Sequence, residues 1–293
     1  MANRAARRTL EAHLNPLEVC EANTLYPLGH TAHELARLAR QARLIDPITR
    51  RFLAAAGVGQ GMRVLDLGSG VGDTAFLLAE CVGDSGEVIG VERSAEALGQ
   101  ARRRAAEKGL RHVHFVAGDF AHTRFERAFD AVLGRYVLVF QPDPVAALRA
   151  AATQVRPGGV LLFHEVDFAG ERASPVVPAY ERACRWVVEA LARGGSDPAM
   201  GARLHASFRA AGLPAPTLQL EALLGGDAVA ADLLRSKCEL VETLLPEILR
   251  HEVASAEEVG IANLCERMLH EAQVRDALIV GRSEIGAWVR KPH

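Results

Sequence analysis

The sequence has few of the features that mark membrane, secreted and nucleic-acid-binding proteins. No stretch approaches the roughly 18 uninterrupted apolar residues that a membrane-spanning helix needs, so none is predicted. The five cysteines are odd in number, widely spaced and never arranged as C-x-x-C. This argues against a disulfide framework or a zinc knuckle and favours a reducing cytoplasm. A net charge of −2 gives no general attraction for nucleic acid or an anionic membrane surface.

The chain does have enough apolar material for a large core. Of its 293 residues, 49% are hydrophobic and 24% are charged, which excludes a disordered chain. The length suits one large domain or two modest ones. No internal repeat or low-complexity tract divides the sequence.

Short apolar segments alternate with helical patterns through the middle of the chain. Each segment has the length of a buried strand, and the stretches between them carry apolar residues at helical spacing. Strands that alternate with helices form a parallel sheet covered on both faces, so the predicted fold class is α/β. The five predicted strands span residues 63–67, 88–92, 112–116, 129–133 and 160–163.

Helical patterns flank this region on both sides. A capping box at 31–34 begins one helix, and Asp46-Pro47 predicts the start of a second. Beyond Asp167 the chain is mainly helical, with a sixth strand predicted over 217–223 and a last one over about 285–290. One α/β domain with helical additions therefore explains the pattern better than two separate domains.

A glycine-rich turn, Gly68-Ser69-Gly70-Val71-Gly72, lies between the first strand and the first helix. Open parallel sheets bind ligands there, and glycine lets the backbone approach a ligand closely. The spacing departs from the G-x-G-x-x-G of dinucleotide sites, because the sixth position is Asp73. A carboxylate there would repel a pyrophosphate and tolerate a cofactor with a cationic amino-acid part. Asp73 also has an ordinary interpretation as the N-cap of the helix.

Acidic residues follow the second and third predicted strands. Glu92 ends the second strand, where a carboxylate can accept hydrogen bonds from two ribose hydroxyls. After the third strand, Asp119 could accept from an adenine amino group while Phe120 packs on the base. The alternatives are a solvated strand-end glutamate and a polar loop cap beside a core phenylalanine.

These segments, in this order, resemble the motifs of class I S-adenosylmethionine-dependent methyltransferases. The branch they resemble most is related to the methyltransferases of ubiquinone and menaquinone biosynthesis. The resemblance covers about residues 61–168 and rests on V-L-D-L-G-S-G-V-G-D at 64–73, V-I-G-V-E at 88–92, G-D-F at 118–120, F-D-A-V at 129–132 and R-P-G-G-V-L-L-F at 156–163. Upstream, Y-P-L-G-H-T-A-H-E at 26–34 is similar to a segment of some bacterial members that covers the cofactor.

The resemblance implies a Rossmann-like, seven-stranded sheet in the order 3-2-1-4-5-7-6 with an antiparallel last strand. It implies S-adenosyl-L-methionine as cofactor and S-adenosyl-L-homocysteine as product. Arg135 and its neighbour Tyr136 could contact the cofactor carboxylate or the acceptor, with structural packing as the alternative. The residues expected to bind the cofactor are Tyr26, Gly68, Ser69, Gly70, Gly72, Glu92, Arg93, Asp119, Phe120 and Arg135.

The candidate catalytic residues are His164 and Glu165, which leave the fifth strand beside the expected methyl site. A base is needed only when the acceptor must lose a proton. Neighbouring strand residues point to opposite faces, so ordinary geometry aims only one of the two at the ligand. Histidine has the better intrinsic pKa for this task, and the glutamate would need partial burial. No metal ligand set is predicted.

The domain organisation places helices where they can shape an acceptor pocket. We expect an N-terminal helical cap at 1–56 and a methyltransferase domain at 57–293, with helical insertions at about 173–212 and 228–273. The segments 25–45, 177–212 and 228–273 should lie above the carboxyl edge of the sheet, which is where ligands of parallel sheets bind. Their apolar helical surface favours a small, largely apolar acceptor.

The predicted function is transfer of a methyl group to O, N or C of such a molecule in the cytoplasm. No nucleic-acid or membrane partner is expected, and the oligomeric state, a homodimer included, stays open. The first alternative is a protein of this fold that binds S-adenosylmethionine but catalyses cyclisation or isomerisation. The second is a nicotinamide oxidoreductase or a noncatalytic binding module.

Overall fold

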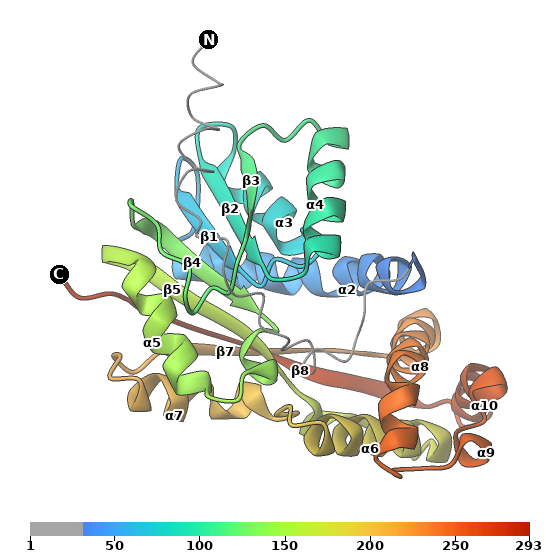
Figure 1. The fold of residues 1–293 in the computed structure, drawn as a ribbon. Coiled ribbons are helices and arrows are strands. Elements are labelled where there is room, and N and C mark those ends of the chain that lie inside the picture. The colour runs from blue at the N-terminus through green and yellow to red at the C-terminus, as the bar shows by residue number, and fades with distance from the viewer. Residues whose placement is uncertain (1–31) are drawn as a thin grey trace.

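The computed structural model describes residues 32–293, which are built around an eight-stranded sheet (Figure 1). Five parallel strands lie side by side in the order β3-β2-β1-β4-β5. They span Arg63–Leu67 (β1), Glu87–Glu92 (β2), Val113–Ala117 (β3), Phe129–Arg135 (β4) and Val155–Asp167 (β5). The remaining strands are β6 (Arg172–Ser174), β7 (Thr217–Gly225) and β8 (Leu278–Arg290). β8 pairs antiparallel with β5, β6 and β7.

The predicted strand order is confirmed. The last predicted strand corresponds to β8, which lies between β5 and β7 and is antiparallel to both. Three details differ from expectation. β6 was not predicted, β5 spans Val155–Asp167 rather than 160–163, and β8 begins at Leu278 rather than near residue 285. The first half of this strand was not predicted from the sequence, because the charged residues Arg282 and Glu284 interrupt its apolar pattern.

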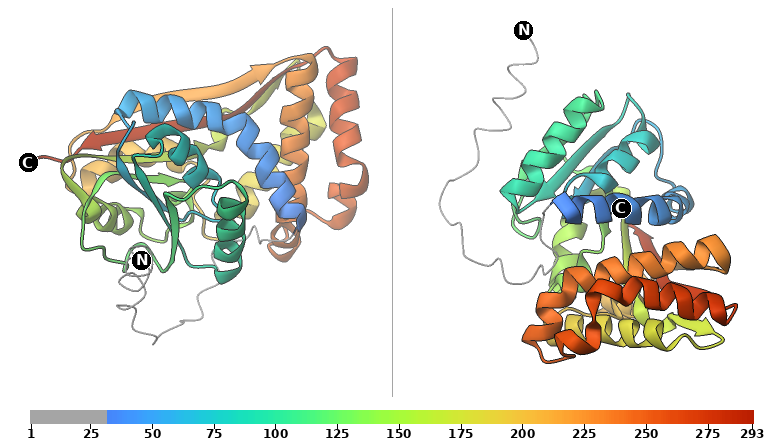
Figure 2. Two further views of the ribbon diagram at one scale, coloured as in Figure 1. Left: turned by 90° about the horizontal axis from the view of Figure 1, so that it is seen from above. Right: turned by 90° about the vertical axis from the view of Figure 1, so that its right-hand side faces the viewer.

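Helices cover both faces of the sheet (Figure 2). One core contains buried residues of the first three described helices, and the core on the opposite face contains those of two others. The first group is α2 (Ala32–Ala56), α3 (Asp73–Val82) and α4 (Ala95–Glu107), and the second is α5 (Pro144–Gln154) and α7 (Met200–Ala210). Thus α7, which lies in the predicted insertion at 173–212, packs on the sheet itself.

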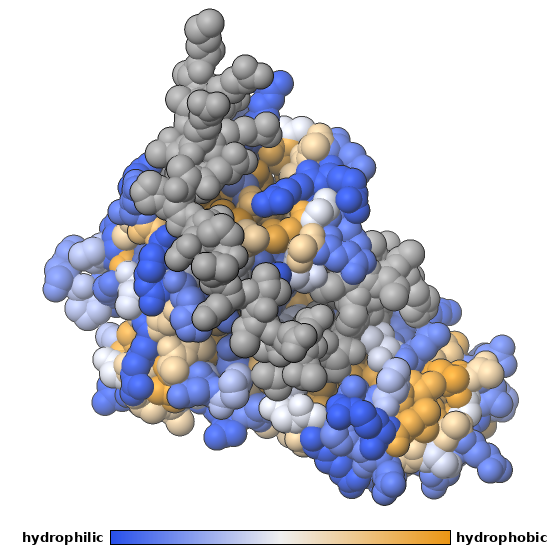
Figure 3. All heavy atoms as spheres, viewed as in Figure 1, coloured by the Kyte–Doolittle hydropathy of each residue, from blue (hydrophilic) through white to orange (hydrophobic). Residues whose placement is uncertain are grey.

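A third core joins the remaining helices to one end of β8. These helices are α6 (Pro178–Arg193), α8 (Asp227–Arg250), α9 (Ala256–Val259) and α10 (Ile261–Val274). They lie at the lower right of Figure 1, and Figure 3 shows apolar surface there between α8 and α10. Two single-turn helices, η1 (Leu138–Phe140) and η2 (Phe168–Gly170), follow β4 and β5.

The prediction of two helices separated at Asp46-Pro47 is wrong, because α2 is one helix with Pro47 inside it. Packing explains the difference. Ile48 and Phe52, just past the proline, are 1% and 0% exposed. A Cβ on Gly286 of β8 would lie 2.6 Å from the Phe52 ring, so this glycine leaves room for the helix. Burial at the sheet outweighs the local cost of an interior proline, about 3 kcal/mol.

Candidate functional site

The glycine turn leaves β1 in a conformation that suits glycine at three positions. Gly68, Gly70 and Gly72 have φ values of 63°, 52° and 95°, in the left-handed region that L side chains rarely adopt. A Cβ on Gly70 would meet nothing within 4 Å, so open space borders the turn there. Backbone N–H groups and open space at the carboxyl end of β1 form a cradle for a ligand.

Asp73 is the first residue of α3, and the N-cap is Gly72. The interpretation of Asp73 as the N-cap is therefore wrong, since φ at the cap position is left-handed and selects glycine. The Asp73 carboxylate instead forms an ion pair with Arg104 of α4, at 2.6 Å between Oδ1 and Nη2.

Glu92 ties the end of β2 to the turn. Its Oε2 accepts a hydrogen bond from the backbone N–H of Gly70 at 3.0 Å, and its Oε1 accepts from Ser94 N–H at 2.8 Å. A carboxylate oxygen has two lone pairs, so each oxygen keeps one for a ligand hydroxyl. Glu92, the residue predicted to bind the ribose, thus lies next to the predicted glycine turn.

Asp66, which the sequence analysis did not select, is the most unusual carboxyl group of this region. It is 1% exposed, and its Oδ2 has no hydrogen-bond partner among the described residues. Burial raises its pKa to about 8, against the lowering effect of Arg135. Its unpaired Oδ2 suits a ligand that brings a hydrogen-bond donor or a positive charge. The signal in the sequence was a charged residue inside the apolar strand V-L-D-L.

Arg93, Asp119 and Phe120 meet at the ends of β2 and β3. The Asp119 Oδ1 accepts from Ala121 N–H at 2.9 Å, and its Oδ2 lies 3.8 Å from Arg93 Nη1. The Asp119 side chain is 36% exposed, which leaves it accessible to a ligand. Phe120 is only 8% exposed and packs in the core under α5 and α7. The remaining predicted cofactor residue, Tyr26, lies outside the described residues.

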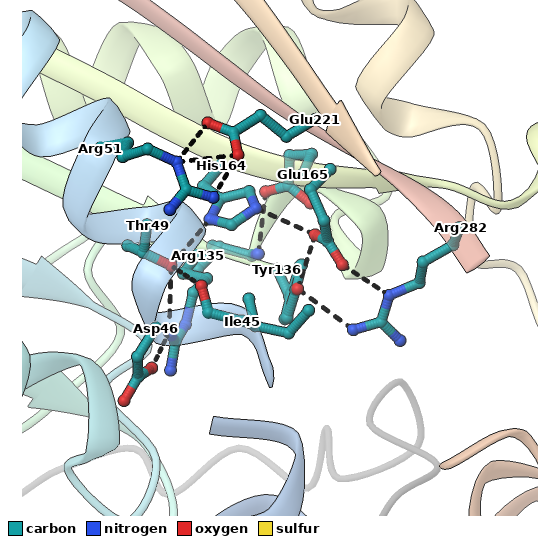
Figure 4. Close-up of polar contacts among 12 residues, drawn as sticks. Ile45, Asp46, Thr49, Arg51, Arg135, Tyr136, His164, Glu165, Glu221 and Arg282 are labelled. Atoms are coloured by element: carbon teal, nitrogen blue, oxygen red, sulfur yellow. Dashed lines mark hydrogen bonds and ion pairs between the residues drawn. The ribbon is translucent and has the colours of Figure 1, made fainter. Parts of the chain in front are cut away.

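A buried polar network lies at the ends of β4 and β5 (Figure 4). Arg135, with 9% of its side chain exposed, donates to Asp46 Oδ1 at 2.7 Å and to Thr49 Oγ1 at 3.2 Å. Both partners lie on α2, so Arg135 joins that helix to the sheet. Arg135 thus packs between α2 and the sheet, within electrostatic reach of Asp66, and its contact with the cofactor stays a prediction.

His164 lies at the centre of this network and is fully buried. Its Nδ1 is 3.1 Å from Thr49 Oγ1, and its Nε2 is 2.9 Å from Glu284 Oε2. Burial lowers the His164 pKa, so the neutral ring prevails at neutral pH. In the arrangement that satisfies both contacts, Nε2–H donates to the Glu284 carboxylate and Nδ1 accepts from the Thr49 hydroxyl. The Ile45 carbonyl oxygen, 3.2 Å from Thr49 Oγ1, competes for that single hydroxyl proton.

The carboxylate of Glu284, on β8, accepts hydrogen bonds from three side chains. Besides His164, the Tyr136 hydroxyl donates to Oε2 at 2.7 Å and Arg282 Nε donates to Oε1 at 2.8 Å. Burial alone would raise the Glu284 pKa, but Arg282 and the hydrogen bonds from His164 and Tyr136 outweigh it and hold the pKa at about 2. Tyr136 has a φ of 56°, a backbone conformation that is rare for an aromatic residue.

Glu165 faces the opposite side of β5. Its two oxygens accept hydrogen bonds from the backbone N–H groups of Val137, Leu138 and Val139 at 2.9, 2.7 and 3.2 Å. Burial raises its pKa to about 8, even though these bonds favour the charged form. The carboxyl group thus anchors the η1 turn.

Sequence reasoning missed Thr49, Arg282 and Glu284, the partners of His164 and Tyr136. The available signal was the pair of charged residues in I-V-G-R-S-E-I-G, which are 100 or more positions away from the residues that they contact. Neither helical nor strand periodicity connects residues so far apart.

A pocket opens between α2, α8 and β8 beside this network. Its cavity volume is about 40 Å³, and about 500 Å³ when the space open to solvent is counted. Apolar residues of its wall are Leu44, Ile45, Leu223, Leu233 and Leu240, and charged ones are Glu171, Lys237, Arg282 and Glu284.

Over the described residues, no helix is long and apolar enough to cross a membrane. Within the same part of the chain, no group of three or more His, Cys, Asp or Glu side chains could hold a metal ion.

Comparison with known proteins matches this chain to a family described as "Methyltransferase domain", over residues 59–211. Aklanonic acid methyltransferase of a Streptomyces species is 37% identical over 118 residues, which cover 40% of this chain and 54% of the relative. Demethylmenaquinone methyltransferase of Lactococcus lactis is 33% identical over 124 residues, covering 42% and 47%. The chain spans about half the length of these curated relatives.

Solved structures share the fold. The YcgJ protein of Bacillus subtilis has a TM-score of 0.54 at 16% identity, covering 86% of this chain and 100% of that one. A phosphoethanolamine N-methyltransferase of Haemonchus contortus, in complex with S-adenosylhomocysteine, has a TM-score of 0.52 at 17% identity. That match covers 88% of this chain and 53% of the other. At these identities the likeness concerns the fold alone.

Proposed function

Since the chain belongs to the class I S-adenosylmethionine-dependent methyltransferases, we propose that it methylates a small, largely apolar molecule. The observation that carries the proposal is the cradle at the carboxyl ends of β1 and β2. There the left-handed glycine turn, the Glu92 carboxylate and the unpaired Asp66 Oδ2 lie at the place where parallel sheets bind ligands.

The residues of the cradle fit the cofactor of this family. We assign Glu92 to the ribose hydroxyls, Asp119 with Arg93 to the adenine end, and Asp66 to the positively charged end. When bound, S-adenosylmethionine supplies an electrophilic methyl group on a sulfonium. The positive charge of the cofactor's amino-acid end would stabilise the ionised carboxylate of Asp66. Tyr26 remains part of the proposal as a residue that covers the cofactor.

The chain itself must position the acceptor and, where necessary, take up a proton. We propose His164 as the proton acceptor. The buried Thr49 hydroxyl, which also donates to the Ile45 carbonyl oxygen, would turn to pass its proton to Nδ1 and receive the acceptor's proton, and Glu284 would stabilise the imidazolium formed. His164 suits this role better than Glu165, whose oxygens are occupied by three backbone N–H groups.

The pocket between α2, α8 and β8 is the proposed acceptor site. Its five aliphatic wall residues support a largely apolar acceptor, and α2 and α8 act as its cover. We therefore retain the proposed division of the chain into an N-terminal helical cap, a methyltransferase domain and helical insertions.

The names of the relatives, which mention aklanonic acid and demethylmenaquinone, also support a small molecule as the acceptor. A net charge of −2 supports the same choice over nucleic acid, and the scattered cysteines support a cytoplasmic location.

Two measurements on the purified full chain test the proposal. Calorimetry should detect binding of S-adenosylhomocysteine, and a panel of small aromatic and polyketide-like acceptors should give acceptor-dependent formation of that product from S-adenosylmethionine. Preferential binding of NADH would favour an oxidoreductase and contradict the proposal. Conversion of an acceptor without release of S-adenosylhomocysteine would favour cyclisation or isomerisation.

A further inference from the structure

The polar end of the acceptor pocket contains an ion pair that the proposed methyl transfer does not use. Lys237 of α8 and Glu171 are each 4% exposed at the side chain, and Lys237 Nζ lies 2.6 Å from Glu171 Oε2. Both residues line the pocket together with Arg282 and Glu284. A buried ion pair contributes little to stability on average, so its position at a ligand pocket suggests recognition.

Lys237 and Arg282 each have more N–H groups than their described hydrogen bonds use. The Lys237 ammonium has three N–H groups, and the ion pair with Glu171 uses one. Arg282 has five, of which one is directed to Glu284 and one to the Tyr136 hydroxyl. The Glu284 carboxylate, by contrast, already accepts from three groups. A ligand that completes this cluster must therefore bring oxygen acceptors.

An aromatic ring lies beside the two cations. Lys237 Nζ is 5.0 Å from the centre of the Phe168 ring, and the Arg282 guanidinium carbon is 5.7 Å from it. Both cations are close enough for attraction to the face of the ring. Phe168 thus helps to hold two like charges near each other, where an anion would be stabilised by both.

Neither cation belongs to the part of the chain that matches the family. That match covers residues 59–211, whereas Lys237 and Arg282 lie beyond it. Lys237 is also one of only three lysines among 34 basic residues. The polar end of the pocket is therefore a feature of this chain's own α8 and β8.

We propose that the acceptor is a small apolar acid, whose anionic oxygen is bound by Lys237 and Arg282 while its body lies against the leucines of the pocket. The proposal rests on the methyltransferase function proposed above and names its substrate class. The anionic oxygen can belong to a carboxylate or to an acidic enol. An uncharged analogue would leave buried donors unmatched and would bind more weakly.

Salicylate and its neutral amide, salicylamide, are matched probes for this pocket. We expect wild-type protein to bind salicylate at least about tenfold more tightly than salicylamide, measured by ligand-observed NMR with and without S-adenosylhomocysteine. Lys237→Met should weaken salicylate binding by about ten- to hundredfold, as for the loss of a hydrogen bond to a charged group, and leave salicylamide unchanged.

Two further variants keep the test decisive. The double variant E171Q/K237M removes both charges, so no unpaired carboxylate stays buried, and it should show the same loss of salicylate binding. Arg235→Met removes an exposed cation of the same helix that pairs with Asp232, and should bind both probes like wild type. Equal binding of the two probes to wild-type protein, or an equal loss of both in Lys237→Met, overturns the proposal.

The cofactor titration separates this inference from the function on which it rests. If S-adenosylhomocysteine binds wild-type protein and all variants equally but no preference for salicylate is found, the substrate class is wrong and the methyltransferase function stands. If S-adenosylhomocysteine does not bind wild-type protein, the proposed function itself is contradicted.

Discussion

At the scale of single residues, Glu92 offers the sharpest test of the cofactor cradle. Glu92→Ala removes the carboxylate assigned to the ribose and its bond to Gly70 N–H. Loss of hydrogen bonds to a charged acceptor costs about 1.5–3 kcal/mol, so S-adenosylmethionine should bind about ten- to hundredfold more weakly in calorimetry. Glu96→Ala, at an exposed position on α4, is the control. Unchanged affinity in Glu92→Ala would remove this residue from the site.

His164 carries a prediction about pH. Burial lowers its pKa below the ordinary 6.5, so the neutral ring is present at neutral pH and is lost only as pH falls through the lowered value. Turnover of an acceptor that must lose a proton should therefore be constant near neutrality and decline at acid pH. His164→Gln should lower the rate by about 10²–10⁴-fold and abolish this acid limb.

Two variants accompany the His164 measurement. Thr49→Val removes the hydroxyl that faces Nδ1, and should also abolish the acid limb. His205→Gln changes an exposed histidine of α7 and should leave the profile as in wild type. A wild-type rate and acid limb in His164→Gln would show that the network only supports the fold, and that the chain catalyses by positioning.

At the scale of elements, α2 and β8 meet where a glycine admits an aromatic ring. Gly286→Ala would place a Cβ 2.6 Å from the Phe52 ring, which has no exposed surface and little freedom to shift. Overpacking of this kind costs about 1–3 kcal/mol, measured as a lower midpoint of denaturant unfolding. Gly59→Ala, where a Cβ would meet nothing within 4 Å, is the control.

A second substitution decides whether crowding is the cause. In the Gly286→Ala background, Phe52→Leu should recover part of the lost stability, because the smaller side chain makes room for the methyl group. If the double variant shows only the sum of the two single losses, the contact between α2 and β8 is not the source of the effect.

Elements defined by local pattern were predictable from the sequence, and those defined by distant contacts were not. The five parallel strands follow from short apolar runs, each bounded by turns. Four lie within two residues of their predicted bounds, whereas β5 extends beyond the predicted 160–163 at both ends, over Val155–Asp167. The break expected at Pro47 is absent, since burial of Phe52 against β8 overrides a local signal. Likewise Glu92 could be found from its place at the end of a strand. Glu284 could not, because only β8 pairing with β5 brings it to His164.

At the scale of the whole molecule, buried acids link stability to pH. The pKa of Asp66 is about 8 in the folded state and 3.8 when unperturbed, chiefly because of burial. Between these values the unfolded chain loses this proton first, so stability should fall as pH rises from about 4 to about 8. Glu165, with a folded pKa of about 8, adds to the same trend.

Thermal unfolding of the protein without cofactor measures this dependence. Asp66→Asn should flatten the decline of Tm between about pH 4 and pH 8, with about 2–4 °C of Tm for each kcal/mol removed. Asp84→Asn, at a fully exposed side chain, should keep the wild-type slope. Saturating S-adenosylhomocysteine should also flatten the slope in wild-type protein, since a cationic partner favours the ionised carboxylate. An unchanged slope in Asp66→Asn would contradict the assignment of a raised pKa.

The place of β8 between β5 and β7 has a consequence for the time course of folding. β5 and β8 are separated by more than 100 residues of chain, so their pairing requires closure of a long loop, and contacts of this kind slow folding. β6 and β7 can join the sheet only through β8. Docking of β8 therefore governs when the far half of the sheet assembles, and Glu284 reaches His164 in that same event.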